Sequence, residues 1–163
     1  GTGEGFTPLP NTAVYAILAA WPDESTARKQ TAEAKIFQTY RTKASEDWTV
    51  ILETSSARGV WSGRAFDATG RTIDGPLAVL TRATVKPRSA FNFWSHAPSV
   101  SQMIGADPNV AFKIGIGEVP LLHQVTFSIC PDTRKMTEFA RESGAHATAD
   151  RAVRDGKWFA EEL

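Results

Sequence analysis

The apolar residues of the chain come in short runs that are separated by longer polar stretches. Residues 11–21 (NTAVYAILAAW) are apolar on both faces that an extended chain would present, which is typical of a buried strand. Pro22 ends this run, and Asp23 is suited to cap a helix that we expect to continue to about residue 45. Residues 47–52 are again apolar and β-branched, so they predict a second strand. The first part of the chain is therefore expected to form a strand, a helix and a strand.

The Gly- and Ser-rich residues 53–76 separate this part from a longer second part. We expect them to form a loop, and we place there the boundary between an incomplete first half, 1–66, and a second half, 67–163. The elements predicted in the second half, in chain order, are a strand at 77–86, a helix at 89–104, strands at 110–116 and 123–129, and a helix at 133–154. One further strand would complete a ferredoxin-like βαββαβ unit.

Two segments of the chain share one sequence pattern. Residues 1–23 and residues 115–132 each run from a G-x-G-E turn through an apolar strand to Pro-Asp. Trp48 and Trp158 follow these two aspartates at nearly the same distance, so the helices between have similar lengths. A repeated supersecondary unit predicts two units that pack together, because neither can bury its apolar face alone. We therefore expect an α+β protein built from two ferredoxin-like half-repeats.

The repeat also draws attention to one histidine. When Asp23 is aligned with Asp132, Phe37 in the first copy matches His146 in the second. Helical spacing places His146 on the same apolar face as Phe139. An imidazole there could ligate a metal such as haem iron, although a single histidine on a helix face is more often a packed core residue. No second histidine or carboxylate stands at a spacing that would build a zinc or non-haem iron site.

Glycines within a predicted strand are a second unusual feature. In VAFKIGIGE, Lys113, Gly115 and Gly117 alternate with the apolar residues, so they lie on the opposite face of that strand. A glycine inside a strand weakens it unless something must approach the backbone closely. A flat ligand over that face, with Lys113 near its edge, would explain both glycines. A β-bulge or a bend of the strand explains them equally well.

Composition and charge exclude several classes of function. Eighteen basic and eighteen acidic residues in 163 give no net charge, which disfavours nucleic acid as the main partner. The apolar runs are shorter than the roughly 20 residues of a membrane span, and no signal peptide is recognisable. The single Cys130 favours a reducing, cytoplasmic setting. The G-x-G-E turns lack the GK[ST] of a phosphate-binding loop. We expect His96 and His123 to be structural.

Several stretches together resemble one family. GEGFTPLPN, VYAILAAWPDE, EDWTV, SARGVWSG, LTRATVKP and DPNVAFKIGIGEVPLLHQVTFSI are similar to sequences of the spheroidene monooxygenases of phototrophic bacteria. The resemblance implies a haem-dependent monooxygenase that converts acyclic carotenoids such as spheroidene to the 2-keto product. It also implies haem b, O2 and a reduced electron donor such as a ferredoxin, on the architecture of the dimeric α+β barrel. Related haem proteins of that architecture ligate iron through a histidine of the last helix, which corresponds to His146 here.

The resemblance leads us to assign roles to further residues. Positive side chains would pair with haem propionates or polarise bound oxygen, so Arg82 and Lys113 are candidate catalytic residues and Arg58 a candidate cofactor contact. Solvated surface charge is the alternative for each. Gly115, Gly117 and Phe139 are assigned with His146 to the cofactor. Aromatic residues expected to line an apolar cleft, unless they pack in the core, are Phe91, Phe93, Trp94 and Phe139.

The resemblance also leads to expectations about assembly and surroundings. A long polyene comes from the bilayer, so we expect a cytoplasmic protein that contacts the inner or photosynthetic membrane peripherally. Family members carry a strand and a helix upstream of the first G-x-G-E turn and a closing strand after the final WFAEEL, residues 158–163, and we expect both to be absent here. Unpaired sheet edges would then favour a homo-oligomer. The alternatives are a non-catalytic haem-binding or scaffold protein and a haem enzyme of the same superfamily with another reaction, such as dehydration.

Overall fold

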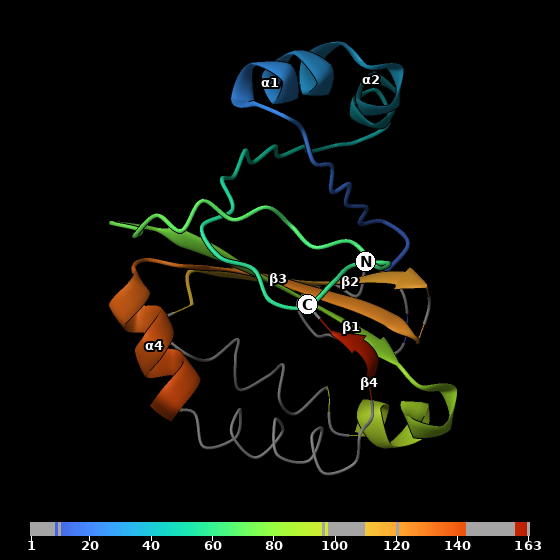
Figure 1. Cartoon of the computed structure of the whole chain (residues 1–163). Helices are drawn as coiled ribbons and strands as arrows, with labels where there is room; N and C mark the ends of the chain where they lie inside the picture. The colour runs from blue at the N-terminus through green and yellow to red at the C-terminus, as the bar shows by residue number, and fades with distance from the viewer. Residues whose placement is uncertain are drawn as a thin grey trace. The chain divides into compact units, whose positions relative to one another are not determined.

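The computed structural model describes most of the chain. The described residues are 9, 11–95, 97, 110–119, 121–142 and 159–162, without the side chains of 138–142 and 161–162. They belong to two compact units, a larger one formed by residues 1–16 and 54–163 and a smaller one formed by residues 17–53. The larger unit contains the sheet, labelled β1 to β4 in Figure 1. The predicted halves 1–66 and 67–163 describe a sequence repeat, and they stay a prediction.

The smaller unit contains two helices where one was predicted. Helix α1 spans Glu24–Glu33 and helix α2 spans Lys35–Arg41, with Ala34 between them in an extended conformation. Because α1 stops there, the carbonyl of Thr31 has lost its helical partner and instead accepts a hydrogen bond of 2.8 Å from Arg41 Nη1. This side-chain contact satisfies the carbonyl that the break exposes. Helical structure is therefore found where it was predicted, but it is interrupted at Ala34 instead of continuous.

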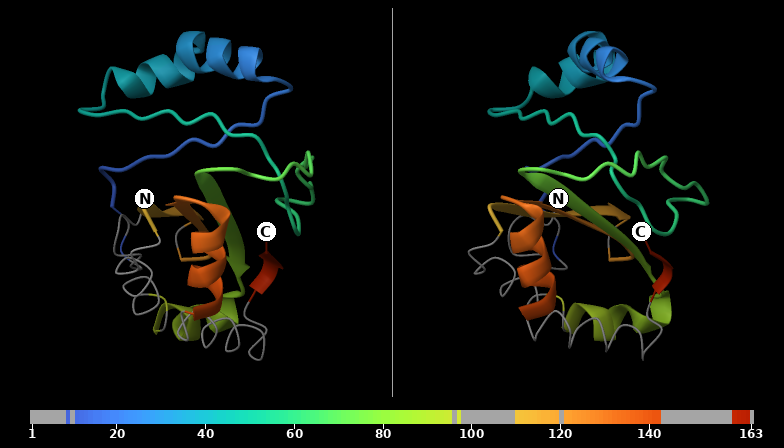
Figure 2. Two further views of the ribbon diagram at one scale, coloured as in Figure 1. Left: turned by 90° about the vertical axis from the view of Figure 1, so that its left-hand side faces the viewer. Right: turned by 60° about the vertical axis from the view of Figure 1, so that its left-hand side comes forward.

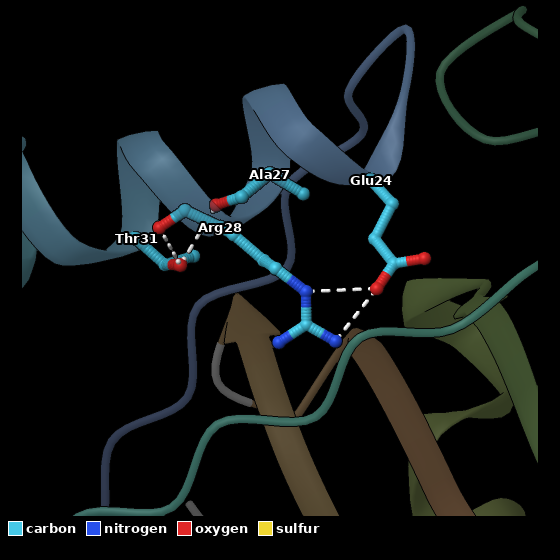
Figure 3. A network of polar contacts seen from close by, with 4 residues as sticks. All are labelled: Glu24, Ala27, Arg28 and Thr31. Atoms are coloured by element: carbon cyan, nitrogen blue, oxygen red, sulfur yellow. Dashed lines mark hydrogen bonds and ion pairs between the residues drawn. The ribbon is translucent and has the colours of Figure 1, made fainter.

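The start of α1 follows the predicted capping. The carboxylate of Asp23 accepts hydrogen bonds from the backbone N–H of Thr26 at 2.7 Å and from the hydroxyl of Ser25 at 2.7 Å. These bonds lower the pKa of Asp23, the backbone bond from Thr26 most strongly. Figure 3 shows the next turn of the helix, where Arg28 Nη2 lies 2.6 Å from Glu24 Oε1.

Two predicted strands of the first part are not formed. Residues 11–21 and 47–52 have no ladder partner in the part of the chain that the structure describes. Their large side chains are correspondingly exposed, Tyr15 by 68% and Trp48 by 61%. An apolar run becomes a strand only when a neighbouring strand pairs with its backbone groups, and the local pattern does not reveal that neighbour.

The larger unit contains an antiparallel sheet with the strand order β2-β3-β1-β4. The elements are β1 Leu77–Val85, the short 3-10 helix η1 Pro87–Ser89 with helical residues 90–95 after it, β2 Phe112–Val119, β3 His123–Cys130, α4 Thr133–Glu142 and β4 Phe159–Glu162. The predicted sequence of strand, helix, strand, strand and helix is confirmed for these residues, and so is the α+β class. The loop predicted at 53–76 is also confirmed, since it holds only an isolated bridge between Trp61 and Arg64.

The strand expected to be missing is present. Residues 159–162 (FAEE) form β4 and pair with the outer side of β1, Ala83 opposite Glu162 and Val85 opposite Phe159. The final residues of the chain thus complete the βαββαβ unit, and the expectation of an absent closing strand was wrong. A four-residue strand is too short for alternation to identify it in the sequence.

The two faces of the sheet have different coverings. Figures 1 and 2 show α4 and the helix at 90–95 on one face, which we call the helix face, and residues 54–76 on the other, which we call the segment face. On the helix face, Val85 and Cys130 are 1% exposed and belong to the core, at opposite ends of β1 because Cys130 pairs with Leu77. Side chains alternate along each strand, so the register decides which predicted site residues share a face.

Candidate functional site

The register separates the two predicted catalytic residues. Arg82 pairs with Val125 of β3, which in turn pairs with Ile116 of β2, so all three side chains lie on the segment face. Lys113 is an odd number of positions away from Ile116 along the same strand, so it lies on the helix face. Arg82 and Lys113 therefore belong to opposite sides of the sheet. One ligand lying on one face cannot contact both side chains.

Arg82 is at the centre of a polar cluster on the segment face. Its side chain is 2% exposed, and its Nε and Nη2 donate to the same oxygen of Glu118, Oε2, at 3.1 and 3.0 Å. The guanidinium carbon lies 5.0 Å from the centre of the Trp61 ring, which comes from the covering segment. A buried guanidinium needs such partners because burial removes its hydration. The contacts tie the loop at 54–76 to the sheet, which is a structural role.

His123 belongs to the same cluster. Its Nδ1 lies 3.5 Å from Oε2 of Glu118, and its side chain is 30% exposed. Thr84 is its ladder partner on β1, and the hydroxyl of Thr84 is buried without a hydrogen-bond partner within the described part of the chain. The structural role expected for His123 agrees with its position beside the Arg82–Glu118 pair.

The helix face carries the two glycines. Gly115 is buried and pairs regularly with Thr126, whereas Gly117 immediately precedes a register shift between Gly117 and Val119. The bulge that sequence reasoning offered as an alternative is therefore real, and it accounts for the second glycine alone. Neither glycine has a positive φ, so backbone conformation does not require glycine at either position.

A buried amide lies beside these glycines. Gln124, the ladder partner of Gly117, is 3% exposed, and its Oε1 has no hydrogen-bond partner among the described residues. A Cβ built on Gly117 would meet the amide atoms Oε1 and Nε2 at 3.8 and 3.9 Å. Sequence reasoning missed Gln124 because apolar and β-branched residues identify a strand, whereas a single polar position within it does not stand out. A glutamine at a core-facing position of a strand was the available signal.

The remaining predicted residues are dispersed. Arg58 is exposed in the covering loop, and Phe91 is 85% exposed, so the prediction that Phe91 lines an apolar cleft was wrong. Phe93 and Trp94 are half-buried, and the Phe93 ring packs edge-on against Phe159 at 5.9 Å. Phe139 lies in α4, with its side chain outside the described part. The predictions for His146 and His96 fall on residues outside the described part of the chain.

The smaller unit contains a pocket of about 320 Å³. Its two arginines are already engaged, Arg28 with Glu24 at 2.6 Å and Arg41 with Asp47 at 3.2 Å and with the Thr31 carbonyl. These partners offset the positive charge that an anionic ligand would need. The remaining residues that line the pocket are Thr31, Ala32, Thr49 and Ile51.

The described residues were compared with the patterns of a metal-binding cluster and of a membrane-spanning helix, and they match neither. They include no group of three or more His, Cys, Asp or Glu side chains arranged to hold a metal ion. Across the same residues, no helix combines the length and apolar character that a membrane crossing requires.

Comparison with known proteins gives the family. The chain is 48% identical over 167 residues to a spheroidene monooxygenase of Rhodobacter capsulatus, and the match covers all of this chain and 69% of that protein. The chain belongs to the spheroidene monooxygenase family. It is also 52% identical to the spheroidene monooxygenase of Cereibacter sphaeroides and 34% identical to that of Rubrivivax gelatinosus, of which it covers 51% and 61%. The chain thus spans about half to two thirds of the length of these relatives.

Other comparisons add little to the family assignment. No family model matches the chain. A solved structure from Mycobacterium tuberculosis shares 14% identity over 54% of this chain and 92% of its own, with a TM-score of 0.47. A structure from Fusobacterium nucleatum shares 11% identity over 88% of this chain and 63% of its own, with a TM-score of 0.49.

Proposed function

We propose that the protein oxygenates an acyclic carotenoid such as spheroidene and forms the 2-keto product. The observation that carries this proposal is the match of the entire chain, at 48% identity, to a protein named spheroidene monooxygenase of which it covers 69%. Conversion of a methylene group to a ketone takes two oxygenations. Each consumes one O2, two electrons and two protons, inserts one oxygen atom and releases the other as water, and the second gives a geminal diol that loses water. An external reductant, such as a ferredoxin, supplies the electrons.

We propose further that haem b supplies the oxygen chemistry and that the imidazole of His146 would bind its iron. The described residues fit a flat group on the helix face. Two residues without side chains, Gly115 and Gly117, lie there beside the buried amide of Gln124, whose Oε1 has no hydrogen-bond partner among the described residues. Lys113 lies on the same face and is a suitable cation for a propionate. Haem would supply the activation of O2 that no amino-acid side chain provides.

The residues of this chain would then act by binding and by excluding water. The backbone at Gly115 allows close approach of a planar group, and the apolar core around Val85 and Cys130 keeps that side of the sheet dry. Arg82 is not part of this arrangement, because it lies on the opposite face and its guanidinium is bound to Glu118. We therefore replace its catalytic assignment by a structural one, as the residue that holds the covering loop through Trp61.

The surroundings of the protein follow from the substrate. A long apolar polyene is dissolved in a bilayer, so we propose peripheral contact with the inner or photosynthetic membrane from the cytoplasmic side. We also retain pairing with a second chain as a proposal, because β2 is an outermost strand in the order β2-β3-β1-β4 of the described sheet.

The test has a binding step and a turnover step. Purified protein that has been supplied with haem should show a Soret band, and with spheroidene, O2 and a reducing system it should form a product whose mass indicates a ketone. A Soret band without product would favour a haem-binding or scaffold protein. Product without a Soret band would overturn the haem proposal and leave the oxygenase proposal in place.

A further inference from the structure

The side chain of Gln124 lacks an explanation within the fold. It is 3% exposed on the helix face, and its Oε1 has no hydrogen-bond partner among the described residues. Burying such a group is unfavourable, because the hydrogen bonds that it made with water are not replaced. A leucine or methionine at this position would fill similar space without that cost. The amide therefore needs a partner that the described residues do not supply.

The neighbours of the amide suggest where that partner lies. Gly117 faces Gln124 across the ladder, and a Cβ at Gly117 would be in ordinary contact with the amide, at 3.8 and 3.9 Å. Gly115 is the next residue on the same face, is buried and pairs regularly with Thr126. The strip of β2 beside the amide thus presents backbone where other strands present side chains. The bulge at Gly117 does not account for Gly115.

We infer that Gln124 is the hydrogen-bonding contact of a flat, conjugated ligand that lies over Gly115 and Gly117, and that this ligand is a porphyrin. The identity of the ligand rests on the proposed function. A carotenoid polyene is less suitable as the direct partner, because a hydrocarbon chain offers no group that can bond with an amide. A porphyrin has carboxylates at its rim, which accept hydrogen bonds. Turning the side-chain amide of Gln124 by 180° places its nitrogen where Oε1 now lies, and that nitrogen can donate to such a carboxylate. Lys113 lies on the same face, where it can meet a second carboxylate.

A comparison of two substitutions tests this inference. Gln124→Leu removes the buried amide on the helix face, and Thr84→Val removes the other buried, unpartnered polar atom, the hydroxyl on the segment face. Both should raise the melting temperature of the haem-free protein by about 1–3 °C, because each removes a buried polar group without a partner. Only Gln124→Leu should weaken haem binding, by about five- to tenfold in a titration followed at the Soret band. Thr84→Val should bind haem as the wild type does.

The outcomes separate this inference from the proposed function. Wild-type haem affinity in Gln124→Leu would overturn the inference and leave the haem proposal in place. A lower melting temperature of haem-free Gln124→Leu would also overturn it, because the amide would then have a partner inside the protein. Absence of a Soret band in the wild type would overturn the haem proposal and this identification of the ligand together. Gln124→Met has a similar length without the amide, so it replaces the leucine variant if that variant does not fold.

Discussion

Loss of the Glu118 carboxylate should destabilise the larger unit far more than loss of a comparable surface carboxylate. In Glu118→Gln the side chain of Arg82 stays 2% exposed, but its guanidinium loses the negative partner whose Oε2 accepts from both Nε and Nη2. Breaking a buried ion pair by removing one partner costs about 3–5 kcal/mol. Glu118 itself is 42% exposed, so water screens the pair and replaces part of the lost interaction. We therefore expect a loss of about 2–3 kcal/mol in the free energy of unfolding.

The chain supplies a matched control for this experiment. The pair of Arg28 and Glu24 has the same chemistry at 2.6 Å, but its side chains are 67% and 65% exposed. Glu24→Gln should therefore cost less than about 0.5 kcal/mol. Arg82→Met removes the buried charge together with its need for a partner, so it should cost less than Glu118→Gln. Urea denaturation followed by tryptophan fluorescence measures all three, and Trp61 reports on the cluster because it lies over Arg82.

One result would contradict the role given to the pair of Arg82 and Glu118. If Glu118→Gln lowered the free energy of unfolding no more than Glu24→Gln, the burial of Arg82 would not make its carboxylate partner necessary. The segment at 54–76 would then be held to the sheet by something other than this pair. A thermal scan gives the same comparison, since 2–3 kcal/mol corresponds to a fall of about 4–12 °C in melting temperature for a chain of this size.

Three further predictions concern Asp23 as the cap of α1, His146 as the proposed iron ligand, and Gly117. Because the pKa of Asp23 is lowered, its ionised carboxylate stabilises α1 fully at pH values above its ordinary pKa of 3.8. This stabilisation is lost as the pH falls through the lower pKa of the folded protein. Asp23→Asn should abolish this pH dependence of the helix content, as measured by circular dichroism. His146→Ala should abolish the Soret band while His123→Ala retains it, and an unchanged spectrum in the first variant would exclude His146 as the ligand. Gly117→Ala should leave the fold intact, since the added Cβ meets only ordinary contacts, but should weaken haem binding at least about tenfold. Undiminished affinity would show that no planar ligand approaches that residue.

The second half of the chain was largely predictable because its signals are local. Phe112, Ile114 and Ile116 alternate with small or polar residues, and this period identifies a strand that is covered differently on its two faces. The runs at 11–21 and 47–52 looked equally convincing but are not strands, because a ladder partner is a property of the three-dimensional arrangement. Strand β4 was missed for another reason, because four residues are too few for an alternating pattern to be recognised.

The site was less predictable than the fold. The strand pattern correctly placed Lys113, Gly115 and Gly117 on one face, yet it gave no means of seeing that Arg82 lies on the other. That separation depends on the register of β1 against β3, which only pairing defines. The partner of Arg82, Glu118, lies beside the bulge, where alternation fails as a guide to direction.

Oxygenation of the carotenoid is the central claim, and isotopic labelling tests it most directly. The purified protein is supplied with haem, spheroidene, a reducing system and isotopically labelled dioxygen, and the product is analysed at once by mass spectrometry. The account predicts a ketone that carries the label, formed only when both dioxygen and reductant are present. A protein that binds haem and spheroidene yet forms no labelled product would contradict it.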